Sequence, residues 1–287
     1  MLLVRRSLLM SLLFALPAAA QPQSWARDDG TVPYVNTPME VVERMLRIAE
    51  VRAGDYLIDL GSGDGRIVIE AVKRGARGLG VDLDAALVKL ATRNAEQAGL
   101  ADRARFEKKD IFETDLSRAS VITMYLVPEF NAKLLDRLLA LKPGTRIVSH
   151  DGSIGDWLSD ETHELRTPEK PVGLGGLSKI ELWIVPADVH GAWTSELPRH
   201  GGTWRLRISQ RYQMLDVQAV AADREVMVRN TRLRGEEVKL VITGLVGSRP
   251  WHHLFVGTAR GDAIDGTLTV SDGSAQTAYP WHATRAR

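Results

Sequence analysis

The chain has 287 residues, of which 44% are hydrophobic and 25% are charged, and its formal net charge is +1 at pH 7. This is an ordinary globular composition with room for two domains, and it lacks the concentrated basic charge of a nucleic-acid-binding protein. Cysteine is absent, which excludes disulfides, cysteine nucleophiles and cysteine-ligated metals. We expect no bound metal and no nucleic-acid partner.

The N-terminal segment has the order of a secretory signal peptide. Two arginines precede an apolar run at residues 8–16, and three alanines at residues 18–20 follow it. The run is too short to span a bilayer comfortably as a permanent helix. We expect cleavage after Ala20 and a periplasmic or secreted protein, whereas a retained leader would anchor it in the inner membrane. Residues 21–32 lack hydrophobic periodicity and are predicted to be a linker.

Residues 36–51 are predicted to form a helix whose N-terminus carries capping signals. Thr37 can cap it, Pro38 stands at the first helical position, and Glu40 completes a T-x-x-E capping box. Apolar residues then recur at helical spacing.

Strand and helix patterns alternate from there to residue 186. Strands are predicted at residues 55–60, 78–83, 104–110, 119–126, 145–150 and 179–186. Helices are predicted at residues 65–74, 84–98 and 128–141. Alternation of this length predicts an α/β fold with a Rossmann-like, doubly wound parallel sheet covered on both faces. We expect this domain to span residues 33–186.

The pattern changes over residues 187–287. Runs at residues 202–210, 225–230, 238–244, 254–259 and 266–270 favour strands, and helical periodicity is absent. The turn signals that separate or bound these runs are Arg260-Gly261-Asp262, Asp265-Gly266 and Asp272-Gly273. We expect a smaller antiparallel all-β domain, either a sandwich or a barrel.

Three glycines follow the first predicted strand, in the stretch LIDLGSGDGRIV. Gly61, Gly63 and Gly65 form G-x-G-x-G, whereas a dinucleotide fingerprint needs a glycine at the position of Arg66. The sequence also contains no G-x-x-x-x-G-K-[ST] phosphate loop. The turn therefore matches neither common phosphate-binding motif.

The glycine turn is also acidic, because Asp59 precedes it and Asp64 lies within it, next to Ser62 and Gly63. Two carboxylates would repel a phosphate. A ligand with a carboxylate and an ammonium fits better, since backbone N–H groups at the turn and helix start can bind the carboxylate and an aspartate the ammonium. S-adenosylmethionine has such an amino-acid end.

The other groups of S-adenosylmethionine predict two further acids, and both are present. Asp82 ends the second strand, where an acid can accept the ribose hydroxyls. Asp110 ends the third strand, where an acid can accept from the adenine amino group while Ile111 packs on the ring. The alternative is that Asp82 and Asp110 only cap helices or solvate loops.

Residues 33–186 resemble class I, seven-strand S-adenosylmethionine-dependent methyltransferases. The segments PYVNTPMEVVERML, DLGSGDGRIVIEA and IVSH are similar to those of small protein-lysine methyltransferases, relatives of the enzymes that modify the ATP synthase c-subunit and the adenine nucleotide translocase. The segment DLGSGDG is also similar to the motif of the histone methyltransferases that lack a SET domain. The resemblance implies that Tyr34 and Thr37 close over the cofactor. Asn36 departs from the usual P-Y-V-P-T-P, which is expected to loosen this segment.

Two residues are candidates for catalysis. Tyr125 lies at the end of the fourth predicted strand, which faces the methyl group in the family that this chain resembles. It can line a lysine channel, accept a proton through water, or pack under the next helix. The same segment lacks the [ND]-P-P-[YF] of adenine-amine methyltransferases, which argues against nucleobase acceptors. His150, followed by Asp151, can act as a general base or form a hydrogen-bonded turn.

The favoured function is methyl transfer from S-adenosylmethionine to a protein lysine. One alternative is a small-molecule O- or N-methyltransferase. Another is a secreted binding protein whose methyltransferase-like domain has lost catalysis. The resemblance does not extend to residues 187–287, so the role of the all-β domain is not predicted.

Overall fold

The structure is a computed structural model that describes residues 34–170, 175–197, 202–246 and 249–286. The predicted signal peptide and the linker lie outside the described residues. Among the described helices, none is long and apolar enough to cross a membrane.

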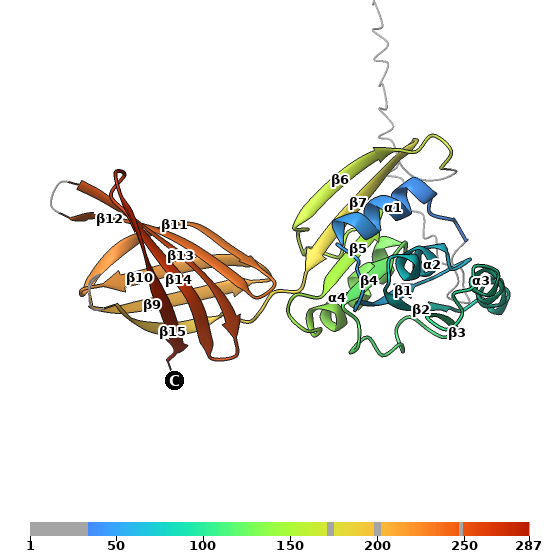
Figure 1. Ribbon diagram of the computed structural model, residues 1–287, viewed down its shortest axis with the longest axis horizontal. Coiled ribbons are helices and arrows are strands. Elements are labelled where there is room, and N and C mark those ends of the chain that lie inside the picture. The colour runs from blue at the N-terminus through green and yellow to red at the C-terminus, as the bar shows by residue number, and fades with distance from the viewer. Residues whose placement is uncertain (1–33, 171–174, 198–201, 247–248, 287) are drawn as a thin grey trace, which may run out of the picture. The chain divides into compact units, whose positions relative to one another are not determined.

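The first part of the described chain is an α/β unit whose strands form one seven-stranded sheet in the order β3-β2-β1-β4-β5-β7-β6 (Figure 1). The helices are α1 (Met39–Ile48), α2 (Arg66–Lys73), α3 (Ala85–Gln97) and α4 (Pro128–Leu139). The strands are β1 (Tyr56–Leu60), β2 (Arg77–Asp82), β3 (Ala104–Lys108), β4 (Val121–Met124), β5 (Arg146–His150), β6 (Glu161–Arg166) and β7 (Leu177–Ile184). The doubly wound α/β fold predicted from the sequence is confirmed.

The sheet is mixed, so the prediction of a parallel sheet throughout was wrong. β3, β2, β1, β4 and β5 are parallel, but β7 runs antiparallel to β5 and β6 antiparallel to β7. A parallel connection needs a long crossover, usually a helix. The chain after β5 instead forms β6, an edge strand that the sequence analysis missed, and folds back through a hairpin into β7.

Helices cover both faces of this sheet because the β-strands are apolar on both sides. Val41 and Met45 of α1 and Val68 of α2 pack with Leu57 of β1 in one buried cluster, to which Ala95 of α3 also belongs. On the opposite face, Leu134 and Leu138 of α4 pack against the sheet. Their partners are Ile58 of β1, Ile122 of β4 and Ile147 of β5, which are neighbouring strands. The carboxyl ends of the parallel strands are thereby held at one rigid edge.

The start of α1 differs from the predicted capping box. Pro38 occupies the N-cap position rather than the first helical one, and the described structure shows no side-chain hydrogen bond capping this helix. The Thr37 hydroxyl instead lies 3.3 Å from Nδ1 of His150, and the Thr37 carbonyl accepts a hydrogen bond from Arg66. Tertiary contacts have therefore replaced the local cap.

The C-terminal part is a separate closed barrel in which each strand pairs antiparallel with its neighbours, in the order β10-β11-β12-β13-β14-β15-β8-β9 (Figure 1). The strands are β8 (Gly191–Leu197), β9 (Gly202–Arg211), β10 (Met214–Ala221), β11 (Arg224–Arg234), β12 (Glu237–Val246), β13 (Arg249–Arg260), β14 (Ala263–Ser271) and β15 (Gln276–Arg285). The all-β prediction is confirmed as a barrel, and β8, β10 and β15 had been missed.

One predicted turn, Asp265-Gly266, lies inside β14. A Cβ atom on Gly266 would be 2.0 Å from the Val256 carbonyl oxygen of the neighbouring strand, so this glycine permits close approach of two strands rather than a turn. The other two predicted turns lie between strands, as expected: Arg260-Gly261-Asp262 joins β13 to β14, and Asp272-Gly273 lies between β14 and β15.

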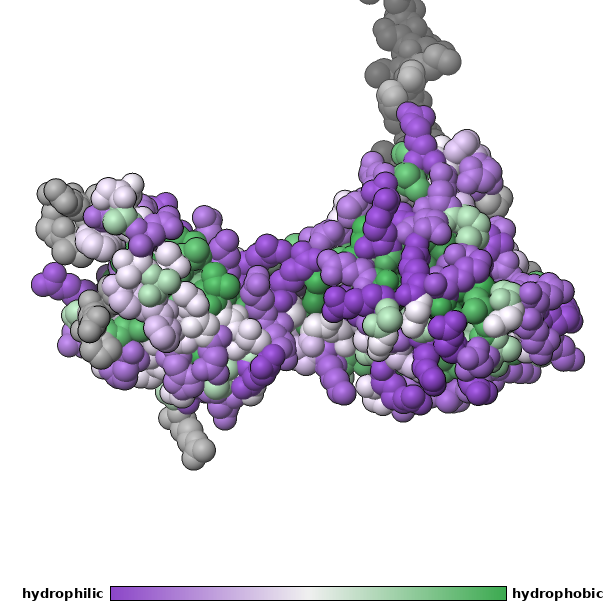
Figure 2. Space-filling view, in the orientation of Figure 1, coloured by the Kyte–Doolittle hydropathy of each residue, from purple (hydrophilic) through white to green (hydrophobic). Residues whose placement is uncertain are grey.

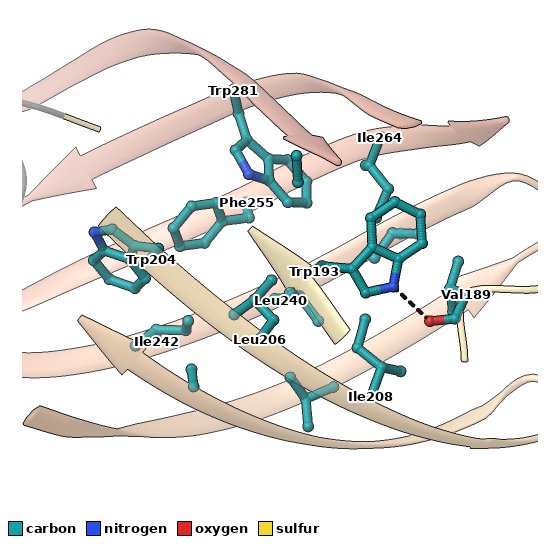
Figure 3. Packing of buried hydrophobic residues seen from close by; sticks show 14 of the residues in the cluster. Val189, Trp193, Trp204, Leu206, Ile208, Leu240, Ile242, Phe255, Ile264 and Trp281 are labelled. Atoms are coloured by element: carbon teal, nitrogen blue, oxygen red, sulfur yellow. Dashed lines mark hydrogen bonds between the residues drawn. The ribbon is translucent and has the colours of Figure 1, made fainter. Parts of the chain in front are cut away.

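Large apolar side chains fill the barrel interior (Figure 3). Trp204, Phe255 and Trp281 form a row with ring centroids 5.3 Å and 5.0 Å apart. Trp193 is buried and donates its indole N–H to the Val189 carbonyl at 2.8 Å. An eight-stranded barrel is just wide enough to be filled by side chains in this way.

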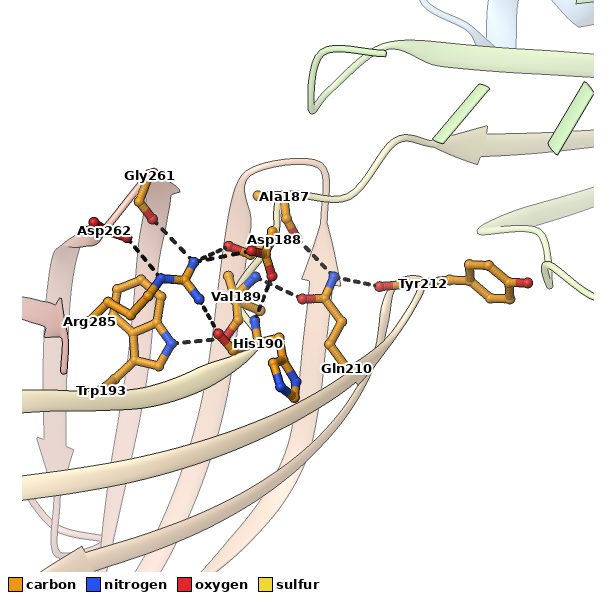
Figure 4. A network of polar contacts seen from close by, with 10 residues as sticks. All are labelled: Ala187, Asp188, Val189, His190, Trp193, Gln210, Tyr212, Gly261, Asp262 and Arg285. Atoms are coloured by element: carbon orange, nitrogen blue, oxygen red, sulfur yellow. Dashed lines mark hydrogen bonds and ion pairs between the residues drawn. The ribbon is translucent and has the colours of Figure 1, made fainter. Parts of the chain in front are cut away.

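A polar network joins the two ends of the barrel chain (Figure 4). Arg285, the last residue of β15, donates to the Asp262 carboxylate at 3.0 Å and to the Asp188 carbonyl at 2.8 Å. Its guanidinium carbon lies 4.6 Å from the ring centroid of Trp193, on the first barrel strand. Arg285 thus links the last barrel strand, β15, to the segment that precedes the first barrel strand, β8.

The visible surface is mostly hydrophilic, with hydrophobic side chains in small groups (Figure 2). The most exposed large apolar residues are Leu158, Met214 and Met227, at 66%, 58% and 58% exposure.

Candidate functional site

The glycine turn lies between β1 and α2, at the carboxyl edge of the sheet. Gly61, Gly63 and Gly65 have φ values of +77°, +54° and +80°, a left-handed conformation that favours glycine. The N–H groups of Gly61 and Ser62 both donate to the carbonyl of Val81 on β2 at 2.9 Å. The turn is therefore tied to the neighbouring strand.

Most of the N–H groups of this turn are engaged within the protein. Gly63 donates to Asp82, Gly65 to the Ser62 carbonyl, and Arg66 to the Asp64 carboxylate. The expectation that these N–H groups bind a carboxylate is thus weakened by the hydrogen bonds already present.

Asp59 is the most deeply buried acid of the site, at 1% exposure. Its Oδ1 accepts a hydrogen bond from the Thr123 hydroxyl at 2.7 Å, while its Oδ2 and the Ser62 hydroxyl have no hydrogen-bond partner within the described chain. Burial, together with the nearby Asp82 and Asp64, raises the pKa of Asp59 to about 7. A buried carboxylate oxygen without a partner is costly and suits a cationic ligand group such as an ammonium.

Tyr34 covers the turn, and Arg66 closes it from the helix side. Burial and the neighbouring Asp64 raise the pKa of Tyr34. The Arg66 guanidinium donates to Asp64 at 2.6 Å, and this pair holds the pKa of Asp64 below its usual value in spite of burial. Asn36, turned so that its amide oxygen faces Arg66, accepts from the guanidinium at 3.0 Å. Asn36 is therefore bound to Arg66 rather than left in a loose segment.

Asp82 and Asp110 lie at, or just after, the carboxyl ends of β2 and β3, as expected. Asp82 accepts from the Gly63 N–H and the Asp84 N–H, both at 2.9 Å, so one carboxylate joins the glycine turn to the end of β2. Asp110 accepts from the Phe112 N–H at 2.8 Å, and the adjoining Ile111 is buried. Their roles toward ribose and adenine stay predictions.

Tyr125 and His150 lie side by side at the carboxyl edge of the sheet. Their ring centroids are 4.0 Å apart. His150 is fully buried, with Nδ1 3.3 Å from the Thr37 hydroxyl and Nε2 2.8 Å from the Ser178 hydroxyl. Burial, with Lys170 nearby, lowers the pKa of His150 to about 4. Because both ring nitrogens are engaged by hydroxyl groups and the lowered pKa makes the ring a weak base, the structure favours the hydrogen-bonded role over a general base.

A pocket brings together Tyr125, the glycine turn and the segment ahead of α1, whereas Gly65, Asp82, Asp110, Ile111 and His150 are not part of its lining. Its lining is Tyr34, Val35, Asn36, Thr37, Asp59, Gly61, Ser62, Gly63, Asp64, Arg66, Ile67 and Tyr125. The sequence analysis did not identify two charged residues at or near the site, Arg66 and Lys170. Arg66 was considered only as a missing glycine, although a cation beside an acidic turn is itself a signal. Lys170, which contacts Asp151, gave no local signal.

The part of the chain that the structure describes holds no group of three or more histidine, aspartate or glutamate side chains arranged to bind a metal ion.

Comparisons with known proteins found a family model, sequence relatives and solved structures that are similar to this chain. The family model of the ANTKMT methyltransferase domain matches residues 59–161. A protein-lysine N-methyltransferase of Saccharolobus islandicus is 45% identical over 129 residues, which cover 44% of this chain and 80% of that protein. The adenine nucleotide translocase lysine N-methyltransferase of Mus musculus is 33% identical over 163 residues, which cover 56% of this chain and 65% of that protein.

A solved structure is also similar to about half of the chain. The RNA methyltransferase from Salinibacter ruber in complex with S-adenosyl-L-homocysteine has 46% sequence identity and a TM-score of 0.48, covering 54% of this chain and 96% of that one.

Proposed function

Because the chain belongs to the family of S-adenosylmethionine-dependent protein-lysine methyltransferases, we propose that it transfers methyl groups to the ε-amine of a lysine in a protein substrate. The observation that carries the proposal is the buried Asp59 carboxylate at the glycine turn, with one oxygen lacking a partner among the described residues. That oxygen matches the ammonium of the cofactor's methionine end.

The residues of the site divide into those that hold the cofactor and those that face the acceptor. Asp59 would hold the ammonium, Asp82 the ribose and Asp110 the adenine amine. When bound, S-adenosylmethionine supplies a methyl group on a sulfonium whose leaving group is a neutral thioether. The protein therefore has to orient the reactants and exclude water rather than activate the leaving group.

The acceptor lysine must be neutral to attack, so its surroundings have to disfavour the ammonium. Burial, with the nearby Asp151, raises the pKa of Tyr125 to about 12. The phenol therefore keeps its proton at neutral pH and serves as a hydrogen-bonding group beside the pocket rather than as a base.

The proposed location is outside the cytoplasm, in the periplasm or secreted, with attachment to the inner membrane if the leader is retained. The order of charged, apolar and small residues over residues 1–20 supports it. N-terminal sequencing of the protein recovered from the cell envelope tests this, and a mature chain that begins at Gln21 is expected. Recovery of the intact N-terminus from the cytoplasm would contradict it.

A labelled-methyl assay tests the activity. The purified protein is incubated with S-adenosylmethionine carrying a tritiated methyl group and with envelope proteins, and labelled peptides are mapped. We expect label on lysine. Label in small molecules or in added RNA would assign another acceptor, and absence of cofactor binding in isothermal titration at near-millimolar concentration would reject the enzymatic function.

A further inference from the structure

A cation stands at the start of α2, where a helix does not favour one. Arg66 is the first residue of α2, and the N-cap residue Gly65 supplies no side-chain cap. The amino end of a helix carries partial positive charge, so a guanidinium there lowers the stability of the helix. The first turn of α2 contains no acid to offset that charge. The role of Arg66 therefore has to be sought in the groups that its side chain contacts.

The Arg66 guanidinium distributes its five N–H donors over three groups. Nε donates to the Asp64 carboxylate at 2.9 Å, and Nη2 donates to the same carboxylate at 2.6 Å. Nη1 donates to the Thr37 carbonyl at 2.9 Å. The remaining donors of Nη1 and Nη2 face the Asn36 amide oxygen at 3.2 Å and 3.0 Å, once that amide is turned towards the guanidinium. Each donor thus has a partner in the described chain, so Arg66 is not placed to bind the cofactor carboxylate itself.

The partners of Arg66 belong to two segments that line one pocket. Asp64 lies in the glycine turn, whereas the other two partners lie in residues 34–37, which we call the cover segment. The two segments also touch directly, because a Cβ atom on Gly63 would lie 2.4 Å from Cε2 of Tyr34. Arg66 therefore joins the cover segment to the turn by hydrogen bonds at the place where the two segments pack together.

The cover segment is held from a second side as well. The Thr37 hydroxyl lies 3.3 Å from Nδ1 of the buried His150, whose Nε2 lies 2.8 Å from the Ser178 hydroxyl. His150 thus fixes the end of the cover segment that enters α1. Arg66 fixes the part that lies beside the turn, through Asn36 and the Thr37 carbonyl.

We propose that Arg66 is a positioning residue that clamps the cover segment onto the glycine turn, in the position that encloses the methionine end of S-adenosylmethionine. This inference rests on the proposed function for the identity of the ligand. A cover segment that is already in place needs no ordering when the ligand binds, and such preorganisation strengthens binding. A cover segment that is in place for only a fraction of the time weakens the apparent affinity by that fraction.

The first test observes the cover segment directly and needs no ligand. The full chain is labelled with ¹³Cε-tyrosine, and the Tyr34 resonance is identified by its loss in Tyr34→Phe. Arg66→Lys keeps a cation beside Asp64 but lacks the planar fork that reaches the cover segment at the same time. We expect the Tyr34 resonance of this variant to move towards the position of an exposed tyrosine.

Arg74→Met is the matched control for this measurement. Arg74 is the C-cap residue of the same helix, and its side chain is 26% exposed, compared with 24% for Arg66. It pairs with Glu43 of α1 rather than with the cover segment. The Tyr34 resonance of Arg74→Met is expected to stay in place.

The second test measures the binding of S-adenosylhomocysteine by isothermal titration. We expect Arg66→Lys to raise the Kd about tenfold, because the cover segment is then in place for about a tenth of the time. Asn36→Ala removes part of the clamp and is expected to raise the Kd less. The double variant should be little worse than Arg66→Lys, because both changes act through one guanidinium. Arg74→Met is expected to bind as the wild type does.

Each outcome decides the inference. An Arg66→Lys protein with an unchanged Tyr34 resonance would overturn it, and so would an equal effect of Arg74→Met. A displaced resonance with an unchanged Kd would overturn it too, since the cover segment would then have no part in binding. If Arg66→Lys does not fold, Asn36→Ala takes its place with the same expected directions. If the wild type binds no S-adenosylhomocysteine, the proposed function fails, whereas the resonance still decides whether Arg66 holds the cover segment.

Discussion

The ring of Tyr34 packs directly on Gly63: a Cβ atom on this glycine would lie 2.4 Å from Cε2 of the tyrosine. Tyr34 is 46% exposed, so one side of the ring contacts the turn and the other faces solvent. The segment ahead of the first strand and the glycine turn therefore form one surface. The role of Tyr34 over the cofactor, which the resemblance implies, stays a prediction.

The variant Gly63→Ala is expected to weaken the binding of S-adenosylhomocysteine at least about tenfold, because the new methyl group displaces Tyr34 and strains a left-handed position. Isothermal titration measures the effect. Gly99→Ala is the control, since Gly99 has φ +68° but has nothing within 4 Å of an added Cβ. Equal affinities of the two variants would show that Tyr34 takes no part in binding.

The affinity for S-adenosylhomocysteine should depend on the ionisation of Asp59. Because burial raises the pKa of Asp59 to about 7, the free protein must lose a proton to bind the ligand ammonium. Below this pH the affinity is expected to fall about tenfold for each pH unit, and above it to level off. Titrations between pH 5.5 and 8.5 would measure this slope. An Asp59→Asn variant that retained the same slope would assign it to another group.

Asp59→Asn should also raise stability at high pH. In the folded protein the pKa of Asp59 is raised from 3.8 to about 7, so the folded state holds this proton more tightly than the unfolded state. The resulting stabilisation is present at acidic pH and is lost as the pH rises through about 7. Asparagine has no proton to lose, so the variant should exceed the wild-type Tm at pH 8 and match it more closely at pH 5. The opposite order of these Tm differences would contradict the pKa shift.

Arg285 is expected to stabilise the barrel by about 2 kcal/mol through its hydrogen bonds and its stacking on Trp193. Arg285→Ala leaves the Asp188 carbonyl without this donor and removes the side-chain link to the segment before β8, while the backbone pairing of β15 with β8 remains. Chemical denaturation followed by tryptophan fluorescence would measure the loss. Arg260→Ala is the control, because Arg260 is 76% exposed and makes a longer 3.3 Å contact with Glu236. Equal losses in the two variants would contradict a closing role.

The sequence predicted the α/β unit well because its central strands, such as β1 and β4, are apolar runs that alternate with segments of helical spacing, and both are local signals. It did not predict β6, whose six residues alternate between partly buried and exposed side chains and carry several charges. Such an edge strand is defined by pairing with β7, and pairing between strands leaves little trace in a polar segment. The sequence analysis therefore predicted a parallel sheet.

The acids of the site were predictable because each lies at, or just after, the carboxyl end of a strand. The partners that modify those acids were not. Arg66 binds Asp64, two residues away, but the same arginine also reaches the Thr37 carbonyl across 29 positions. Lys170 meets Asp151 only through the fold of the hairpin. Likewise, Asp265-Gly266 has the composition of a turn, and only the close approach of Val256 shows why glycine stands there.

The buried His150 should make the protein less stable in mild acid. Its pKa is lowered from 6.5 to about 4, mainly by burial, so the unfolded chain takes up a proton between these values that the folded protein excludes. Stability from this group is present above pH 6.5 and is lost as the pH falls towards 4. His150→Gln keeps a polar side chain that does not titrate, so its Tm should be lower than wild type at pH 7.5 but change less between pH 7.5 and 5. His282→Gln is the control, because His282 is 60% exposed on the barrel. Differential scanning calorimetry at both pH values measures the slopes, and an unchanged slope in His150→Gln would assign the acid sensitivity to other groups.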